Sequence, residues 1–262
     1  MDYYRKYYFG IISIYIICNM VLYYLFYYGY KWVWVMVIPK FNFPFYGIAI
    51  VLSIFIGMFF IYYNLRKDGE KNMQILLYFI MYIAFAFICG KMYTVFAYGE
   101  GNIITAGLSA YGGLIGVVIA SIIFEKILPT DKKIIKYTIL SLPLVYGLTK
   151  IGCSIVGCCG GIPYEGIFKI KYINALNIWQ FPIQIVEVIV FLLIFLICYF
   201  IKNNKNIDYI VLLLVSIFKF LLDFLRYDHI NILITRNQIF SIILFFVTII
   251  VFMIHKKNKL SN

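Results

Sequence analysis

Charged side chains recur inside long apolar segments of this sequence, where burying a charge is costly. Lys219, Asp223 and Arg226 are spaced i, i+4 and i+7, so on a helix they share one face. Further charged residues within apolar segments are Lys91, Lys150 and Glu187. A charged residue at the centre of a membrane helix costs roughly 2.5 to 3.5 kcal/mol on insertion scales, so such residues mark functional sites by default.

The embedded cations outnumber the embedded carboxylates. There are two carboxylates, Glu187 and Asp223, and four basic residues, which are Lys91, Lys150, Lys219 and Arg226. The set therefore predicts a net positive site whose ligand is anionic. Since the embedded charges fall in the outer half of the membrane, a phospholipid phosphate fits best. The alternative is that these side chains snorkel to the headgroups and pair to hold helices together. That alternative explains single residues well, but it would place charges near both membrane faces, and the inner halves of the segments are almost bare of charge.

The amino-acid composition indicates the class of protein to which these charged residues belong. Of 262 residues, 64% are apolar or aromatic and 13% are charged. A soluble domain carries about 25% charge, and a disordered chain is poor in aromatic residues, so both classes are excluded. We predict an all-α polytopic membrane protein in one domain, with about seven or eight transmembrane helices of about 20 residues each. The predicted spans are 7–28, 45–65, 73–97, 107–124, 137–158, 182–201, 208–226 and 237–254.

The basic residues predict the orientation in the membrane. If the N-terminus is cytoplasmic, 14 basic residues lie inside: Arg5, Lys6, Arg66, Lys67, Lys71, Lys126, Lys132, Lys133, Lys136, Lys202, Lys205, Lys256, Lys257 and Lys259. Only five lie outside: Lys31, Lys40, Lys169, Lys171 and Arg236. Positive residues gather on the cytoplasmic side, so we expect both termini there. This asymmetry accounts for the net charge of +12 without a nucleic-acid partner. Segment 7–28 lacks a following small-residue cleavage site and is interpreted as an uncleaved span.

Two glycine-rich segments, 106–116 and 147–161, interrupt the apolar pattern. Gly112 and Gly116 form a small-xxx-small pair that allows close helix packing. In the second segment, Gly160 and Gly161 precede Pro163 and favour the end of a helix. Packing alone explains the second segment less well, because Lys150 lies within it.

These segments resemble motifs of the bacterial prolipoprotein diacylglyceryl transferases. Segment 106–116 resembles the family's Gly-x-Ser-x-His-Gly-Gly-Leu-x-Gly, and segment 147–161 resembles its signature, which opens Gly-x-Gly-Arg-x-Gly. Segment 181–187 is similar to the family's His-Pro-Ser-Gln-Leu-Tyr-Glu. Further matches are 45–47 with Trp-Tyr-Gly, 218–226 with a helix ending Glu-Phe-Phe-Arg, and 238–241 with Gly-Gln-x-x-Ser. The matches keep family order across a core of 38–254, to which 7–28 is an apparent addition.

The resemblance implies transfer of a diacylglyceryl group from phosphatidylglycerol to the cysteine thiol of a lipobox-containing preprolipoprotein. The reaction takes place at the outer face of the bacterial cytoplasmic membrane, so membrane lipid is a partner, and no cofactor is implied. The resemblance assigns catalysis to Tyr111, Lys150 and Arg226. It assigns substrate binding to Tyr46, Lys91, Gly112, Gly113, Gln184, Glu187, Asp223 and Gln238.

The sequence departs from the family pattern at positions that bear on chemistry. Tyr111 replaces His, and a tyrosine is almost never deprotonated at neutral pH. Lys150 and Lys91 replace Arg, which keeps the charge but loses the bidentate fork. A second hypothesis is therefore a degenerate homologue that binds an anionic lipid or lipopeptide without turnover. A small transporter is disfavoured, because the inner half of the membrane lacks polar groups for a pathway.

Three cysteines cluster in the second glycine-rich segment: Cys153, Cys158 and Cys159. They need not be nucleophiles under the transferase hypothesis, because the acceptor thiol belongs to the substrate. We expect no metal site, since no His lies nearby and the spacing gives no paired ligand motif. A reversible disulfide stays open, although adjacent Cys158 and Cys159 would form a strained pair.

Overall fold

The structure is a computed structural model that describes residues 34–38, 45–99, 102–103, 106–128, 133–172, 178–230 and 232–260. Its described part contains seven α-helices, which confirms the predicted all-α membrane fold. They are α2 (Phe45–Lys67), α3 (Asn72–Tyr98), α4 (Ala110–Ile127), α5 (Lys133–Val156), α6 (Ile183–Phe200), α7 (Ile207–Asp223) and α8 (Arg236–Leu260). A 3-10 turn, η1 (Tyr227–Ile230), follows α7. The predicted span 7–28 lies outside the described residues.

Six of these helices are long and apolar enough to cross a membrane. The remaining helix, α7, has 17 residues and carries Asp208, Lys219 and Asp223. Large apolar side chains face outward from the bundle, among them Phe59, Phe200 and Phe246. Helices that are apolar on both their inner and outer faces belong in hydrocarbon, so the chain is an integral membrane protein.

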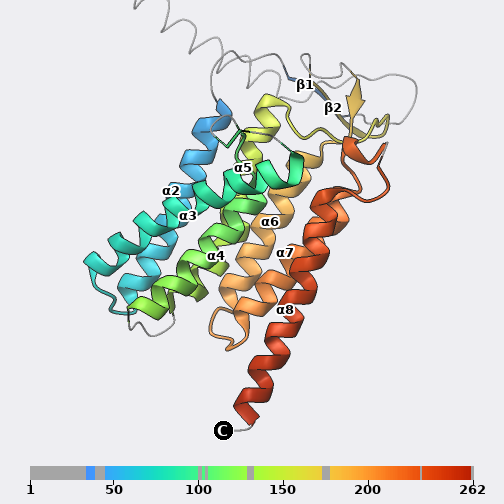
Figure 1. Cartoon of the computed structure of the whole chain (residues 1–262). Coiled ribbons are helices and arrows are strands. Elements are labelled where there is room, and N and C mark those ends of the chain that lie inside the picture. The colour runs from blue at the N-terminus through green and yellow to red at the C-terminus, as the bar shows by residue number, and fades with distance from the viewer. Residues whose placement is uncertain are drawn as a thin grey trace, which may run out of the picture.

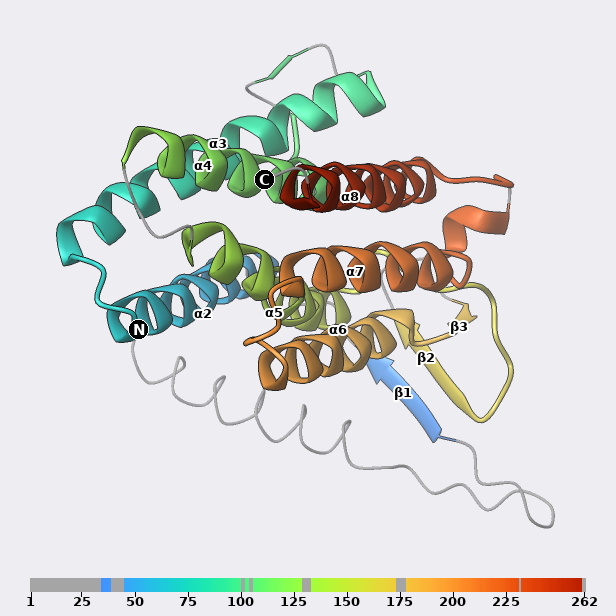
Figure 2. The ribbon, with the colours of Figure 1, turned by 90° about the horizontal axis from the view of Figure 1, so that it is seen from below.

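Helix α5 lies at the centre of the bundle, in contact with α2, α4, α6 and α7 (Figure 1). Seen from below, α3 packs on α4, and α8 packs on α7 (Figure 2). Gly112 and Gly116 let α4 approach α3 closely, because a Cβ at either position would collide with the α3 backbone. Without a hydrophobic force between helices in lipid, such small residues allow the close packing that holds helices together.

A small three-stranded sheet lies at one end of the bundle (Figure 1). Strand β2 (Phe168–Tyr172) pairs in parallel with β1 (Trp34–Ile38), from Trp34 opposite Phe168 to Ile38 opposite Tyr172. It pairs antiparallel with β3 (Trp179–Gln180). We call this end, where α5 and α7 finish and α6 and α8 begin, the sheet end. The sheet adds to the helical fold and has no counterpart among the sequence-based expectations.

Candidate active site

The carboxylate of Glu187, near the start of α6, is the centre of a buried polar cluster. It is fully buried, and three cations contact it. Lys150 Nζ lies 2.9 Å from Oε2, and Lys219 Nζ lies 2.7 Å from Oε1. Arg226 Nη2 lies 3.0 Å from Oε1 and 3.2 Å from Oε2, and the Tyr146 hydroxyl donates to Oε1 at 2.9 Å. We call these five residues the Glu187 cluster.

Helical spacing on three elements brings the Glu187 cluster together. Tyr146 and Lys150 are four residues apart on α5, so both face α6. Lys219 lies on α7, and Arg226 follows in the turn after that helix. Since α5, α6 and α7 pack against one another, their polar faces meet in the interior rather than at the lipid surface.

A second carboxylate, Asp223, connects this cluster to α8. Its Oδ1 lies 3.4 Å from Arg226 Nε, without hydrogen-bond geometry at that nitrogen. The Thr235 hydroxyl donates to Oδ2, and Asn237 Nδ2 donates to Oδ1 at 3.5 Å. Gln238 Oε1 accepts from the Thr235 backbone N–H at 3.1 Å. Asp223 and Gln238 therefore fix the start of α8 beside the cations.

Together with Asp223, the Glu187 cluster carries an excess of positive formal charge. Lys150, Lys219 and Arg226 supply three positive charges, and Glu187 and Asp223 supply two negative charges, which leaves a net charge of +1. These five charged side chains are each at most 8% exposed, so their charges act in a medium of low dielectric constant. An anion entering this site would gain more than it would from the same cations in water.

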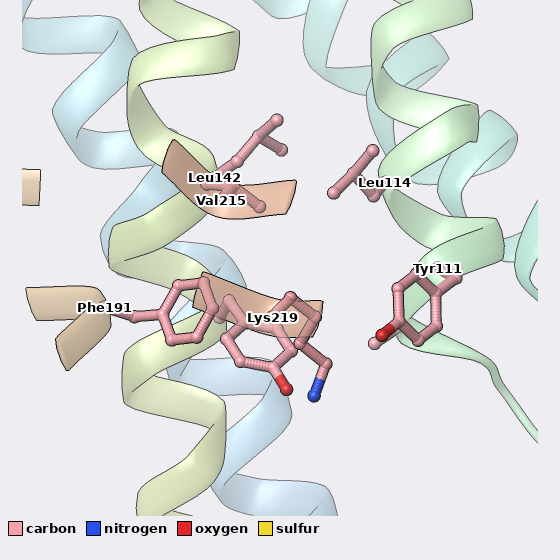
Figure 3. Close-up of a pocket in the computed structure, with 8 residues that line it drawn as sticks. Tyr111, Leu114, Leu142, Phe191, Val215 and Lys219 are labelled. Carbon is pink, nitrogen blue, oxygen red and sulfur yellow. The ribbon is translucent and has the colours of Figure 1, made fainter. Parts of the chain in front are cut away.

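An apolar cavity adjoins the cluster (Figure 3). Tyr111 and Lys219 face each other across it, with the lysine Nζ 5.9 Å from the tyrosine ring centre. The buried Tyr111 hydroxyl lies beside the Ser241 side chain without hydrogen-bond geometry. The rest of the lining is Ala110, Leu114, Leu142, Tyr146, Phe191 and Val215. The cavity thus combines apolar walls with one cation and one phenolic hydroxyl.

Of the sequence-predicted site residues, the structure brings Lys150, Glu187 and Arg226 into contact and places Asp223 directly beside them. It places Tyr111 at the adjoining cavity.

Other predicted site residues lie elsewhere. Lys91 Nζ donates to the Ile103 carbonyl at 3.1 Å and lies over the Phe87 ring, outside the Glu187 cluster. Tyr46, at the start of α2, is 39% exposed and packs near Gly152.

The two predicted glycines contact α3 rather than the cluster. A Cβ on Gly112 would collide with Cys89 and Gly90, whereas Gly113 lies beside Ala86 with more room. This placement agrees with the packing interpretation of the first glycine-rich segment.

The turn after α5 connects the second glycine-rich segment to Arg226. Gly161 forms an antiparallel bridge with Arg226, and the Tyr227 N–H donates to the Gly160 carbonyl at 3.0 Å. Buried Gln184 anchors the same turn, since its Nε2 donates to the Cys158 carbonyl at 2.9 Å. The pKa of the Cys159 thiol lies well below its usual value, because Cys153 and Cys158 hydrogen-bond to it and Lys150 and Arg226 add positive charge.

Sequence reasoning missed two residues that hold the site together. Tyr146 donates to Glu187, and its only signal was the i, i+4 spacing to Lys150. Thr235 donates to Asp223 from a loop whose residue types gave no signal.

Comparison with known proteins agrees with this architecture. The family model for prolipoprotein diacylglyceryl transferase matches residues 33–254, which is most of the chain. No curated protein sequence matches the chain significantly. The chain therefore belongs to the prolipoprotein diacylglyceryl transferase family, a family of membrane transferases in lipoprotein biosynthesis.

Proposed function

We propose that this chain transfers a diacylglyceryl group from phosphatidylglycerol to the cysteine thiol of a lipobox-containing preprolipoprotein. The observation that carries this proposal is the convergence of Lys150, Lys219 and Arg226 on the single carboxylate of Glu187. One positive charge remains uncompensated beside an apolar cavity. Such a site matches a phospholipid, whose phosphate is anionic and whose acyl chains are apolar.

The proposed reaction requires stabilisation of a departing phosphate. The cysteine sulfur, as a thiolate, attacks the glyceryl carbon that bears the phosphate oxygen. A carbon–sulfur bond forms as the carbon–oxygen bond breaks, and glycerol phosphate leaves with the bonding electrons. The thiol proton passes to solvent. Negative charge grows on the leaving phosphate, and we assign Lys150 and Arg226 to bind it, since cations already in place cost no reorganisation.

Glu187 is assigned as a positioning residue for these cations. Without it, three buried positive charges would repel one another and separate. With it, Lys150 and Arg226 contact the same carboxylate from α5 and from the turn after α7. A phosphate binding beside Glu187 could share both cations, so their positions are set before the substrate arrives.

Tyr111 is assigned a hydrogen-bonding role. Its buried hydroxyl lies beside Ser241 without good hydrogen-bond geometry, so a ligand that completes a hydrogen bond there would lower the free-energy cost of burying it. Facing Lys219 across the cavity, it is placed to contact the lipid headgroup or the incoming thiol. This role needs no deprotonated tyrosine.

We further propose that the sheet end lies at the outer face of the bacterial cytoplasmic membrane, with both termini inside. Basic residues supporting this orientation occur at the opposite end of the bundle: Arg66, Lys67, Lys126, Lys202, Lys256 and Lys257. Cytoplasmic loops are enriched in such residues. The Glu187 cluster would then lie at the depth of outer-leaflet headgroups.

One observation favours the second candidate function, a homologue that binds an anionic lipid or lipopeptide without turnover. Tyr111 stands where the family resemblance places a histidine, and the hydroxyl is a poor base at neutral pH. Such a protein would bind phosphatidylglycerol at the same cations and give no thioether product. Restoring histidine with Tyr111→His and arginine with Lys150→Arg would leave it inactive.

The deciding experiment combines the purified chain with phosphatidylglycerol and a lipobox peptide, and follows the peptide by mass spectrometry. We expect a mass gain of one diacylglyceryl group on the cysteine peptide and none on the same peptide with cysteine changed to serine. Rescue of a cell depleted of its own transferase should agree. Absence of product across the pH range, with phosphatidylglycerol still bound, would favour the binding protein instead.

A further inference from the structure

Three cysteine side chains meet at the turn that ends α5. Cys153 lies in the last turn of the helix, and Cys158 and Cys159 follow within six residues. Their three Sγ atoms lie within 4.8 Å of one another. Cys153 is buried, Cys158 is half-buried and Cys159 is exposed, so the group is open on one side.

The backbone of this turn is held in an uncommon conformation that points the thiols together. Gly157 has φ +79°, and Cys159 has φ +56°, the one positive value at a non-glycine residue in the described part of the chain. A left-handed conformation at such a residue is energetically unfavourable and persists only where its surroundings enforce it. Here the enforcing contacts are Gln184 on the Cys158 carbonyl and Tyr227 on the Gly160 carbonyl.

We propose that Cys153, Cys158 and Cys159 form a three-thiolate site for a thiophilic metal ion, with Zn²⁺ as its occupant. Zinc binds thiolates at about 2.3 Å, which places tetrahedral sulfur ligands about 3.8 Å apart. The observed limit of 4.8 Å meets that requirement with little movement. Thiolate sulfur is also the ligand type that selects zinc over magnesium or calcium.

Two cations of the Glu187 cluster lie near this site. Three thiolates and one Zn²⁺ carry a net charge of −1, and Lys150 lies one helical turn before Cys153. Arg226 lies alongside Gly161, next to the cysteine turn. No fourth His, Cys, Asp or Glu joins the thiols among residues the structure describes, so the fourth position is open to water or to an external ligand beside exposed Cys159. Three protein ligands with an open position is the arrangement of reactive rather than closed zinc sites.

This inference revises the sequence-based expectation of no metal site. The spacing of Cys153, Cys158 and Cys159 matches no paired ligand motif, because the grouping arises from the helix end and the left-handed turn. A disulfide among them would use two of the three thiols and leave the third without a role. Adjacent Cys158 and Cys159 would also be strained as a pair.

The test titrates Zn²⁺ into the full chain, purified in detergent, reduced and stripped of metal, against a chromophoric chelator. We expect about one bound equivalent, and a loss of affinity of about tenfold or more in Cys159→Ser and Cys153→Ser. Cys159→Ser is the safer variant, since that side chain is exposed. The matched controls Cys89→Ser and Cys198→Ser change cysteines outside the cluster and should bind as the parent chain does.

Co²⁺ provides a second readout, because thiolate ligands give it charge-transfer absorption that Cys159→Ser should weaken. Zinc binding that is unchanged in Cys159→Ser, or no binding by the reduced chain, overturns the proposal. A Cys153 disulfide found without reductant, together with no zinc binding after reduction, assigns the cluster to redox chemistry instead. These measurements use neither lipid nor peptide, so their outcome is independent of the proposed transferase activity.

Discussion

Lys219 Nζ lies 2.7 Å from Oε1 of Glu187, although the two residues are 32 positions apart and lie on different helices. Neither side chain is more than 5% exposed. The same carboxylate oxygen accepts from Arg226 and from Tyr146. Glu187 therefore offsets part of the positive charge of Lys150, Lys219 and Arg226, which would otherwise repel one another.

Replacing Glu187 with glutamine should damage both stability and activity. Glu187→Gln would keep the shape of the side chain but leave three buried cations beside a neutral amide, and breaking a buried ion pair in this way costs about 3 to 5 kcal/mol. We expect a lower thermal midpoint in detergent and loss of transfer. Light scattering or tryptophan fluorescence during heating, with the peptide assay, would measure both.

The matched control is Glu125→Gln. Glu125 lies in α4 toward the opposite end of the bundle, where its Oε1 accepts from the Ile135 N–H at 2.9 Å. This substitution makes the same chemical change and should leave transfer close to that of the parent chain. Equal loss of transfer in both variants would mean that Glu187 has no special role.

Lys150 tests the assignment of a phosphate contact. Lys150→Ala removes one cation from the leaving group, and a loss of about 10²-fold or more in transfer rate is expected from the removal of one such contact. Lys150→Arg keeps the charge and supplies a bidentate fork, so activity should stay within about tenfold of the parent. Initial rates at saturating phosphatidylglycerol would separate these outcomes.

Lys202→Ala is the control for the lysine series. Lys202 Nζ contacts Asn64 Oδ1 at 3.3 Å, far from the Glu187 cluster at the opposite end of the bundle. Its removal should leave the transfer rate nearly unchanged. An equal loss in Lys202→Ala and Lys150→Ala would point to a general effect of charge rather than to phosphate binding.

Gly116→Ala should loosen the contact between α3 and α4. The new methyl group would meet the Phe85 backbone, which cannot move aside as a side chain can, and overpacking of this kind costs about 1 to 3 kcal/mol. Gly107→Ala is the control, because nothing lies within 4 Å of its Cβ position. A thermal midpoint lowered equally by both substitutions would contradict the packing account.

Thr235→Val should weaken the connection between α7 and α8. The Thr235 hydroxyl donates to Asp223, and leaving that buried carboxylate oxygen without this donor costs about 1 to 3 kcal/mol. Thr248→Val is matched, since the buried Thr248 hydroxyl donates only within α8, to the Leu244 carbonyl at 2.7 Å. We expect a larger drop in thermal midpoint and in transfer for Thr235→Val, and the reverse order would refute this role.

The sequence predicted much of the helical architecture. All seven described helices overlap predicted spans, with ends that differ by only a few residues, because about 20 consecutive apolar residues signal a membrane helix directly. The predicted shared helix face of Lys219, Asp223 and Arg226 applies to the first two only, because α7 ends at Asp223 and Arg226 lies in the turn that follows. The small sheet was not predicted, because β1 and β2 pair across about half of the chain, from Trp34 to Phe168, and no local pattern encodes that pairing.

The contacts of the site could be predicted only in part. The charged residues could be identified because charges are rare within apolar segments. Which of them meet could not, because the contacts of Lys150, Lys219 and Arg226 with Glu187 depend on how α5, α6 and α7 pack. Lys91 looked equivalent in sequence and lies instead against the Ile103 carbonyl. Packing of helices against each other, rather than helix formation, decides which of these charges share a site.

The most direct test of the central claim is the release of glycerol phosphate from phosphatidylglycerol nanodiscs that contain the purified chain and a lipobox peptide. We predict one glycerol phosphate for each lipidated peptide, release that depends on the peptide cysteine, and near-complete loss of release in Lys150→Ala. Release at the parent rate by Lys150→Ala, or peptide lipidation without glycerol phosphate, would contradict the account.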